Sequence, residues 1–75
     1  MNEMVAVTWT DAVFDYEDPG PHENYLNTTV GFLVDRGPRF IRVAAERTPD
    51  GWRAMTSIPL VLVDEGGIRT LGEIP

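Results

Sequence analysis

The sequence predicts an all-β fold, a small antiparallel barrel of five short strands. Val, Ile, Thr and aromatic residues alternate with a period of two over much of the chain, as pleated surfaces prefer. Gly, Pro, Asp and Asn separate these stretches at short intervals, as in a chain of hairpins. No helical period of useful length is present. The 75 residues are expected to form a single small domain, residues 1–75.

The first strand is expected over residues 4–16. Alternate residues from Val5 to Trp9 are apolar and face one side, but from Ala12 the apolar residues continue on the opposite parity. A bulge at the preceding residue would explain the change. Residues 17–27 follow as a long acidic loop, because they hold two prolines, a glycine and two asparagines. Long loops in small domains often carry function.

Four further strands are expected, over residues 28–35, 39–46, 52–58 and 68–71. A turn at residues 35–38 separates the first two of them. Residues 48–51, Thr-Pro-Asp-Gly, predict a hairpin between the next two. Proline fixes φ at the first turn position there, and glycine can adopt the left-handed conformation.

Residues 60–63 are apolar at every position and follow Pro59, which has no N–H to donate to a ladder. They are expected to form either a 3₁₀ turn that plugs a barrel end or a short buried strand. Residues 64–67, Asp-Glu-Gly-Gly, predict a turn before the last strand. This pattern fits an SH3-like or Sm-like barrel best. The alternative is an open meander that dimerises through an edge strand.

Charge is distributed unevenly along the chain. Residues 1–35 hold seven carboxylates and no Lys or Arg, whereas residues 36–53 hold five of the six basic residues, and the net charge is −6. Such a chain is expected to repel nucleic acid and anionic membranes over most of its surface. It has no cysteine, and its first residues are acidic where a signal peptide is basic. A cytoplasmic location is therefore expected.

The chain lacks the residues that most catalytic sites need. It has no Cys or Lys, a single histidine (His22) and a single serine (Ser57) with no base visible beside it. The acids around His22 do not match a calcium-binding loop, because Pro19 and Leu26 occupy ligand positions. No Gly-rich phosphate-binding loop is present. We therefore expect no enzyme, no metal ion and no cofactor.

The acidic loop is expected to be a protein-binding surface. Two tyrosines flank it, and exposed aromatic residues are enriched at interfaces, whereas the aromatic residues on strands are expected in the core. The predicted partner-binding residues are Asp15, Tyr16, Glu17, Asp18, Glu23 and Tyr25. The one-sided charge favours encounter with a basic partner. The arginines near Phe40 and Trp52 are a second candidate, for nucleic acid, which the net charge opposes.

Three short motifs point to a known group of proteins. Residues 7–12 read Val-x-Trp-x-Asp-Ala, residues 29–34 read Thr-Val-Gly-Phe-Leu-Val, and residues 57–59 read Ser-Ile-Pro. With the acidic loop between the first two, this pattern resembles small SH3-like barrel proteins of unknown function encoded by bacteriophages and prophages. The chain departs from the pattern by a longer Asp-Glu-Gly-Gly insertion before its last strand. The resemblance implies a phage accessory protein and carries over no catalytic residue.

One function is preferred, the first below, and two alternatives remain open. The first is a non-catalytic accessory protein that binds and modulates a host protein through an acidic, aromatic-flanked surface in the host cytoplasm. A basic or nucleic-acid-binding protein is one candidate for the host partner. The second is an acidic nucleic-acid mimic that inhibits a DNA- or RNA-binding enzyme or a defence complex. The third is a structural subunit of a homo-oligomer. None of them involves direct contact with nucleic acid or a membrane.

Overall fold

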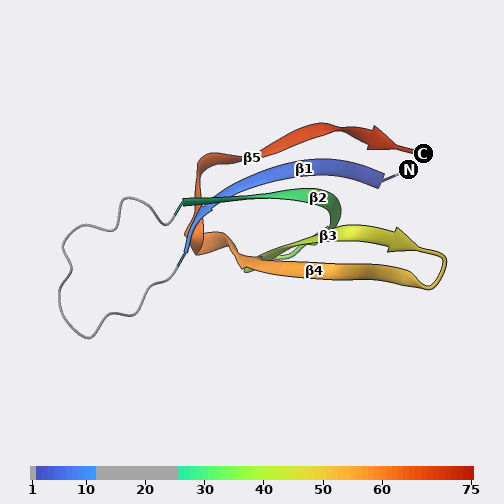
Figure 1. Cartoon of the computed structure of the whole chain (residues 1–75). Helices are drawn as coiled ribbons and strands as arrows, with labels where there is room; N and C mark the ends of the chain where they lie inside the picture. The colour runs from blue at the N-terminus through green and yellow to red at the C-terminus, as the bar shows by residue number, and fades with distance from the viewer. Residues whose placement is uncertain (1, 12–25) are drawn as a thin grey trace.

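The computed structural model describes residues 2–11 and 26–75, which form a five-stranded antiparallel sheet in the order β4-β3-β2-β1-β5 (Figure 1). A 3₁₀ turn, η1, connects β4 to β5. The prediction of an all-β fold with five antiparallel strands is confirmed. The elements are β1 (Asn2–Thr10), β2 (Leu26–Arg36), β3 (Phe40–Thr48), β4 (Gly51–Pro59), η1 (Leu60–Leu62) and β5 (Val63–Ile74).

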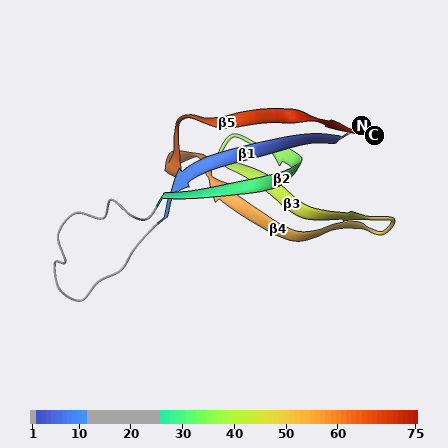
Figure 2. The ribbon, with the colours of Figure 1, turned by 45° about the horizontal axis from the view of Figure 1, so that its top comes forward.

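The sheet is open, because the edge strands β4 and β5 are not paired with each other. The sequence predicted a closed barrel, and the connection between these strands explains the difference. Pro59 ends β4 without a ladder donor, and η1 then carries the chain to the opposite edge of the sheet. Figure 2 shows that β5, β1 and β2 run side by side while β3 and β4 cross beneath them. The sheet is therefore strongly coiled although it is not closed.

The hydrophobic core lies on the inner side of the coiled sheet. Its centre is formed by side chains from β1, β3 and β4 that are at most 1% exposed: Val5, Val7, Ile41, Val43 and Ile58. Partly buried side chains pack around them: Trp9, Leu33, Leu60, Val63 and Ile68. The alternation predicted from Val5 to Trp9 is therefore the inward face of β1. The Trp9 indole N–H also donates to Thr29 Oγ1 over 2.9 Å, which satisfies its polar atom.

The predicted turn at residues 64–67 is instead a bulge within β5. Val7 pairs with Ile68 and Trp9 pairs with Val63, so four residues of β5 lie opposite Thr8 alone. The two glycines allow this. Gly66 has φ +68°, and a Cβ on Gly67 would lie only 2.5 Å from the Thr8 carbonyl oxygen. β5 is consequently a strand of 12 residues rather than the short one expected.

The remaining strands start earlier or end later than expected. β2 begins at Leu26, so the last two residues assigned to the acidic loop belong to this strand. Residues 12–25, which include the end of the predicted first strand and most of the loop, lie outside the described residues. The hairpin at residues 48–51 is confirmed, since Thr48 pairs with Gly51 and its hydroxyl donates to the Gly51 carbonyl oxygen over 3.0 Å.

Candidate binding site at the loop end of the sheet

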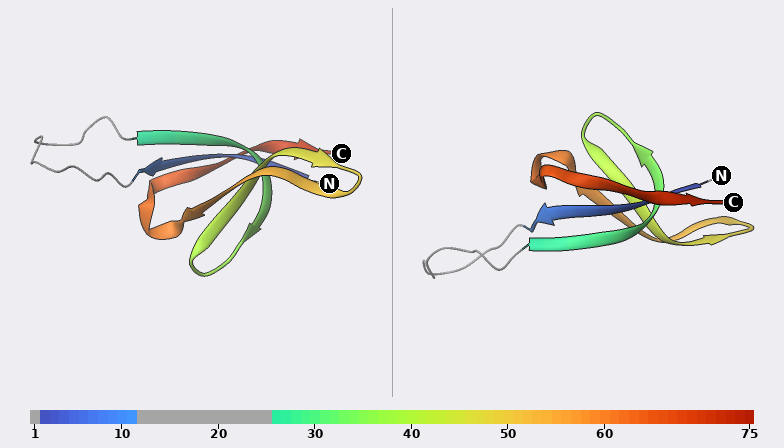
Figure 3. Two further views of the ribbon diagram at one scale, coloured as in Figure 1. Left: turned by 60° about the horizontal axis from the view of Figure 1, so that its bottom comes forward. Right: turned by 90° about the horizontal axis from the view of Figure 1, so that it is seen from above.

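The six predicted partner-binding residues lie outside the described residues: Asp15, Tyr16, Glu17, Asp18, Glu23 and Tyr25. The structure does place the points where their segment is attached. Thr10 and Leu26 are register partners, and the Asn27 side-chain amide donates to the Asp11 carboxylate over 3.3 Å. Both views in Figure 3 place the end of β1 and the start of β2 toward the end of the sheet that also carries η1 and the turn between β2 and β3. We call this the loop end.

η1 is fixed against the turn between β2 and β3. The Leu60 N–H donates to the Arg39 carbonyl oxygen over 2.7 Å, and the Gly37 N–H donates to the Phe40 carbonyl oxygen over 2.9 Å. Phe40 is also the register partner of Pro59. Segments that are 20 residues apart in sequence therefore form one surface at the loop end.

Two large apolar side chains are exposed on these adjoining segments. Val61 is 91% exposed and Phe40 is 46% exposed. The sequence predicted Phe40 in the core, but its place opposite Pro59, at the very start of β3, turns it outward. Likewise, η1 has the predicted 3₁₀ form, yet Val61 points into solvent and only part of the turn packs on the core. Grouped exposed apolar side chains are typical of interaction surfaces.

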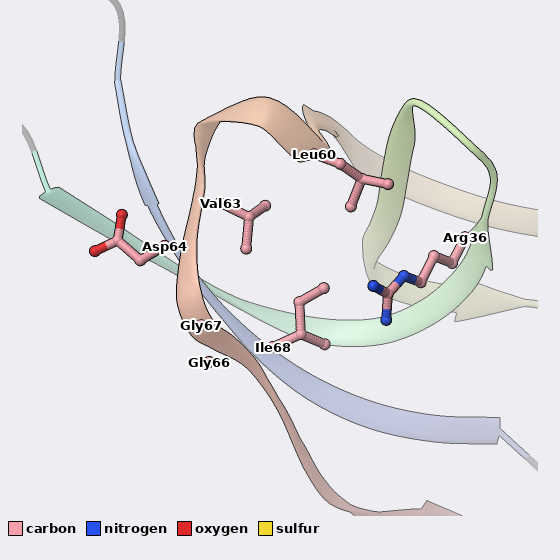
Figure 4. A pocket seen from close by; sticks show the side chains of 7 residues that line it. All are labelled: Arg36, Leu60, Val63, Asp64, Gly66, Gly67 and Ile68. Atoms are coloured by element: carbon pink, nitrogen blue, oxygen red, sulfur yellow. The ribbon is translucent and has the colours of Figure 1, made fainter.

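A hollow of about 370 Å³ opens beside η1. Figure 4 shows the side chains of Leu60, Val63 and Ile68 pointing into it from η1 and β5. These three residues also pack against the buried core, so the floor of the hollow is held in place. The hollow is lined by Arg36, Leu60, Val63, Asp64, Gly66, Gly67 and Ile68.

The charged groups of the hollow differ in their partners. The guanidinium of Arg36 reaches toward the hollow from the end of β2 (Figure 4), and it forms no ion pair or hydrogen bond with any residue that the structure describes. The carboxylate of Asp64 points away from the hollow and accepts a hydrogen bond from the Thr10 hydroxyl over 3.1 Å. The hollow therefore combines aliphatic side chains with a guanidinium that is not paired with any described residue.

Of the other four arginines of residues 36–53, Arg42, Arg47 and Arg53 have side-chain partners, whereas Arg39 has none among the described residues. Arg42 donates to both carboxylate oxygens of Asp35, with its Nε 2.8 Å from Oδ1. This hydrogen bond lowers the pKa of Asp35 and raises that of Arg42, although both groups are well exposed. Arg53 lies 3.9 Å from Glu46. These pairs break up the basic surface that nucleic-acid binding on the hairpin would need.

Arg47 lies near the opposite end of the sheet, where it contacts the start of β1 and the residue that follows β5. Its guanidinium is 5.5 Å from the centre of the Phe32 ring. It donates to the Asn2 side-chain oxygen and, over 2.8 Å, to the main-chain oxygen of Pro75. The Phe32 ring in turn lies 5.7 Å from Trp52. This arrangement is a structural contact rather than a candidate site.

Residues 2–11 and 26–75 contain no group of three or more His, Cys, Asp or Glu placed to hold a metal ion. Within the same ranges, the structure has no helix with the length and apolar character needed to cross a membrane. Comparison of the chain with protein-family models, curated proteins and solved structures gave no match.

The sequence did not point to the hollow. Arg36 was one of several arginines, and its freedom from a carboxylate depends on Arg42 taking the neighbouring Asp35. The apolar character of residues 60–63 is plain in the sequence, but the 3₁₀ geometry decides that Val61 is exposed while Leu60 and Val63 pack toward the core.

Proposed function

We propose that this protein is a non-catalytic accessory protein of phage type that binds and modulates a host protein through the loop end of its sheet. The observation that carries the proposal is the exposure of Phe40 and Val61 on adjoining segments, next to the hollow that Leu60 and Arg36 line. These segments lie at the loop end, where β1 ends and β2 begins. Apolar surface bordered by charge is the usual composition of a protein interface.

The fold proposed for this function is an SH3-like one, in which the coiled sheet stays open between β4 and β5. The strand order, the long segment between β1 and β2, and the 3₁₀ turn before the last strand support it. The phage origin rests on the three sequence motifs, and the host cytoplasm follows from that origin.

Residues 12–25 supply the acidic part of the proposed interface. They carry four carboxylates and no Lys or Arg, and they join the sheet beside Asp11, Asp64 and Glu65. This local excess of negative charge would attract a basic partner and increase the association rate more than the final affinity. Tyr16 and Tyr25 would then supply aromatic contacts in the bound complex.

The test begins with affinity capture from host lysate and identification of the bound protein by mass spectrometry. Binding of the purified partner is then measured for the triple variant Asp15→Asn, Glu17→Gln, Asp18→Asn. We expect association at low salt to slow by about tenfold or more. The matched control neutralises three exposed acids away from the loop end, Glu46, Asp50 and Glu73. Equal association rates for the two triple variants would remove the acidic segment from the interface.

A homo-oligomer is a second candidate, favoured by the open sheet. The outer main-chain groups of β4 and β5 have no strand partner in the described sheet, and such edges can pair with a second copy. Sedimentation over a range of concentrations decides it: a mass that doubles with concentration supports pairing, and a monomer throughout excludes it. The nucleic-acid mimic receives less support, because Asp35 and Glu46 are paired with arginines rather than aligned in a row.

A further inference from the structure

We propose that the hollow beside η1 binds the C-terminal residue of a partner peptide, with a branched aliphatic side chain on the apolar floor and the free carboxylate on Arg36. The inference rests on the proposed protein-binding function, which it deepens by naming the chemistry of the bound group. The proposal is based on the unpaired Arg36 guanidinium beside the aliphatic side chains that line the hollow.

The hollow is large enough to accept one aliphatic side chain together with the carboxylate that follows it. Its volume of about 370 Å³ lies at the lower end of the roughly 300–1,000 Å³ typical of ligand pockets. Leu60, Val63 and Ile68 give it an aliphatic floor that is anchored to the core. A preformed floor of this kind can bury a Leu, Ile or Val side chain without first becoming ordered.

The charge at the rim indicates what accompanies that side chain. Arg36 has no partner among the described residues, and a guanidinium presents a planar fork of donors that matches a carboxylate in a bidentate geometry. In a C-terminal residue the carboxylate is bonded directly to the Cα that bears the side chain. A site with a cation next to an apolar floor can therefore bind the carboxylate and the side chain at the same time.

Other ligand chemistries fit the hollow less well. A phosphate group generally needs several donors, and among the described residues Arg36 is the one side chain lining the hollow that can donate a hydrogen bond. A neutral apolar group would cover Arg36 without pairing its charge, which is costly. The lining carboxylate, Asp64, is directed toward Thr10 and does not compete for Arg36.

The negative net charge of the protein does not prevent such binding. Exposed charges more than about 8–10 Å apart are largely screened at physiological ionic strength, whereas the proposed contact between Arg36 and a carboxylate is direct. Gly66 leaves one side of the rim free of a side chain, since a Cβ there would meet no atom within 4 Å. A peptide main chain can therefore approach the hollow from that side.

The experiment uses isotope-labelled full-length protein and blocked tripeptides, followed by amide resonances in NMR titrations. Acetyl-Ala-Ala-Leu with a free carboxylate is expected to shift the resonances of Gly66, Gly67 and Ile68, with a Kd on the order of 1 mM or below. The C-terminal amide of the same peptide, and acetyl-Ala-Ala-Gly with a free carboxylate, are each expected to bind at least fivefold more weakly.

The variant Arg36→Gln tests the proposed contact. It is expected to weaken binding of the free-acid peptide at least fivefold and to leave binding of the amide unchanged. Arg69→Gln is the matched control, because Arg69 is an exposed arginine on β5 that does not line the hollow. Its effect should stay within twofold. The resonance dispersion of each variant verifies that it is folded.

Three results would overturn the inference: equal affinity for acid and amide, equal effects of the two arginine variants, or shifts that map away from the hollow. Tighter binding of acetyl-Leu-Glu-amide than of the free-acid tripeptide would instead assign the hollow to an internal acidic segment and end the C-terminal proposal. These outcomes are separate from the fate of the proposed function. If peptide binding fails but the partner is still captured, only the peptide proposal is lost. If the peptide binds but the triple variant at Asp15, Glu17 and Asp18 associates with the partner as fast as its control, only the acidic segment is removed from the interface.

Discussion

Gly31→Ala is expected to be among the most destabilising single changes in this protein. Gly31 lies where β2 pairs with β1 and approaches β3. A Cβ at this position would lie 2.4 Å from the Ala44 carbonyl oxygen and 2.9 Å from Val43 Cγ1. The oxygen belongs to the backbone of the neighbouring strand, and the Val43 side chain is only 1% exposed. Neither can move away without disturbing the core.

The expected loss is about 2 kcal/mol. Overpacking against a backbone oxygen lies at the upper end of ~1–3 kcal/mol, while the reduced freedom of the unfolded chain returns only ~0.4–1 kcal/mol. For a domain of this size the total stability is on the order of 4–11 kcal/mol. With a urea m-value of about 1 kcal/mol/M, the midpoint of unfolding should fall by roughly 2 M.

Gly37→Ala is the matched control. A Cβ there has its nearest neighbour, the Phe40 carbonyl oxygen, at 3.9 Å, so its midpoint should stay unchanged or rise slightly. Urea unfolding followed by tryptophan fluorescence measures both variants. If Gly31→Ala unfolds at the same urea concentration as Gly37→Ala, the close crossing of β2 and β3 is wrong.

Three further changes test other parts of the structure. Ala54→Gly should stabilise the protein by ~1 kcal/mol, because Ala54 has φ +53° and a left-handed residue with a side chain is strained. Ala45→Gly, on the neighbouring strand, should destabilise it. If urea unfolding gives the opposite order of stability, the left-handed conformation of Ala54 is wrong. Arg47→Ala should lower the free energy of unfolding by about 1–2 kcal/mol, because the ring contact and the hydrogen bonds are lost. The exposed control Arg69→Ala should change thermal stability little. Equal losses of stability in the two variants would contradict the Arg47 contacts. The Asp35 carboxylate should titrate below its usual pKa of 3.8. Its contribution to stability is therefore present above that pH and is lost as the pH falls through the lower folded pKa. In Arg42→Gln, NMR titration should find the Asp35 pKa closer to its usual value, and an unchanged pKa would exclude the ion pair.

Local sequence patterns predicted most of the strands. The alternation from Val5 to Trp9 identified the inward face of β1, and Thr-Pro-Asp-Gly at residues 48–51 identified the hairpin. Both signals are local, since they depend on the pleat and on backbone preferences of proline and glycine. Patterns of this kind report what a residue does within its own strand.

Tertiary geometry decided what the local patterns missed. Asp-Glu-Gly-Gly at residues 64–67 has turn composition, but pairing of β5 with β1 on both sides makes it a bulge. Phe40 has a large apolar side chain of the kind that is usually buried, but it is the first residue of β3 and is exposed there. The freedom of Arg36 depends on which arginine pairs with Asp35. None of these outcomes can be read from residue spacing alone.

The most direct test of the binding proposal is an NMR map of the captured partner on the isotope-labelled protein. We expect the shifts on complex formation to concentrate in residues 12–25 and, among the described residues, at Arg36, Phe40, Val61 and the β5 bulge. Shifts concentrated instead at the hairpin of residues 48–51 and around Arg47, with the loop end unaffected, would contradict the proposal.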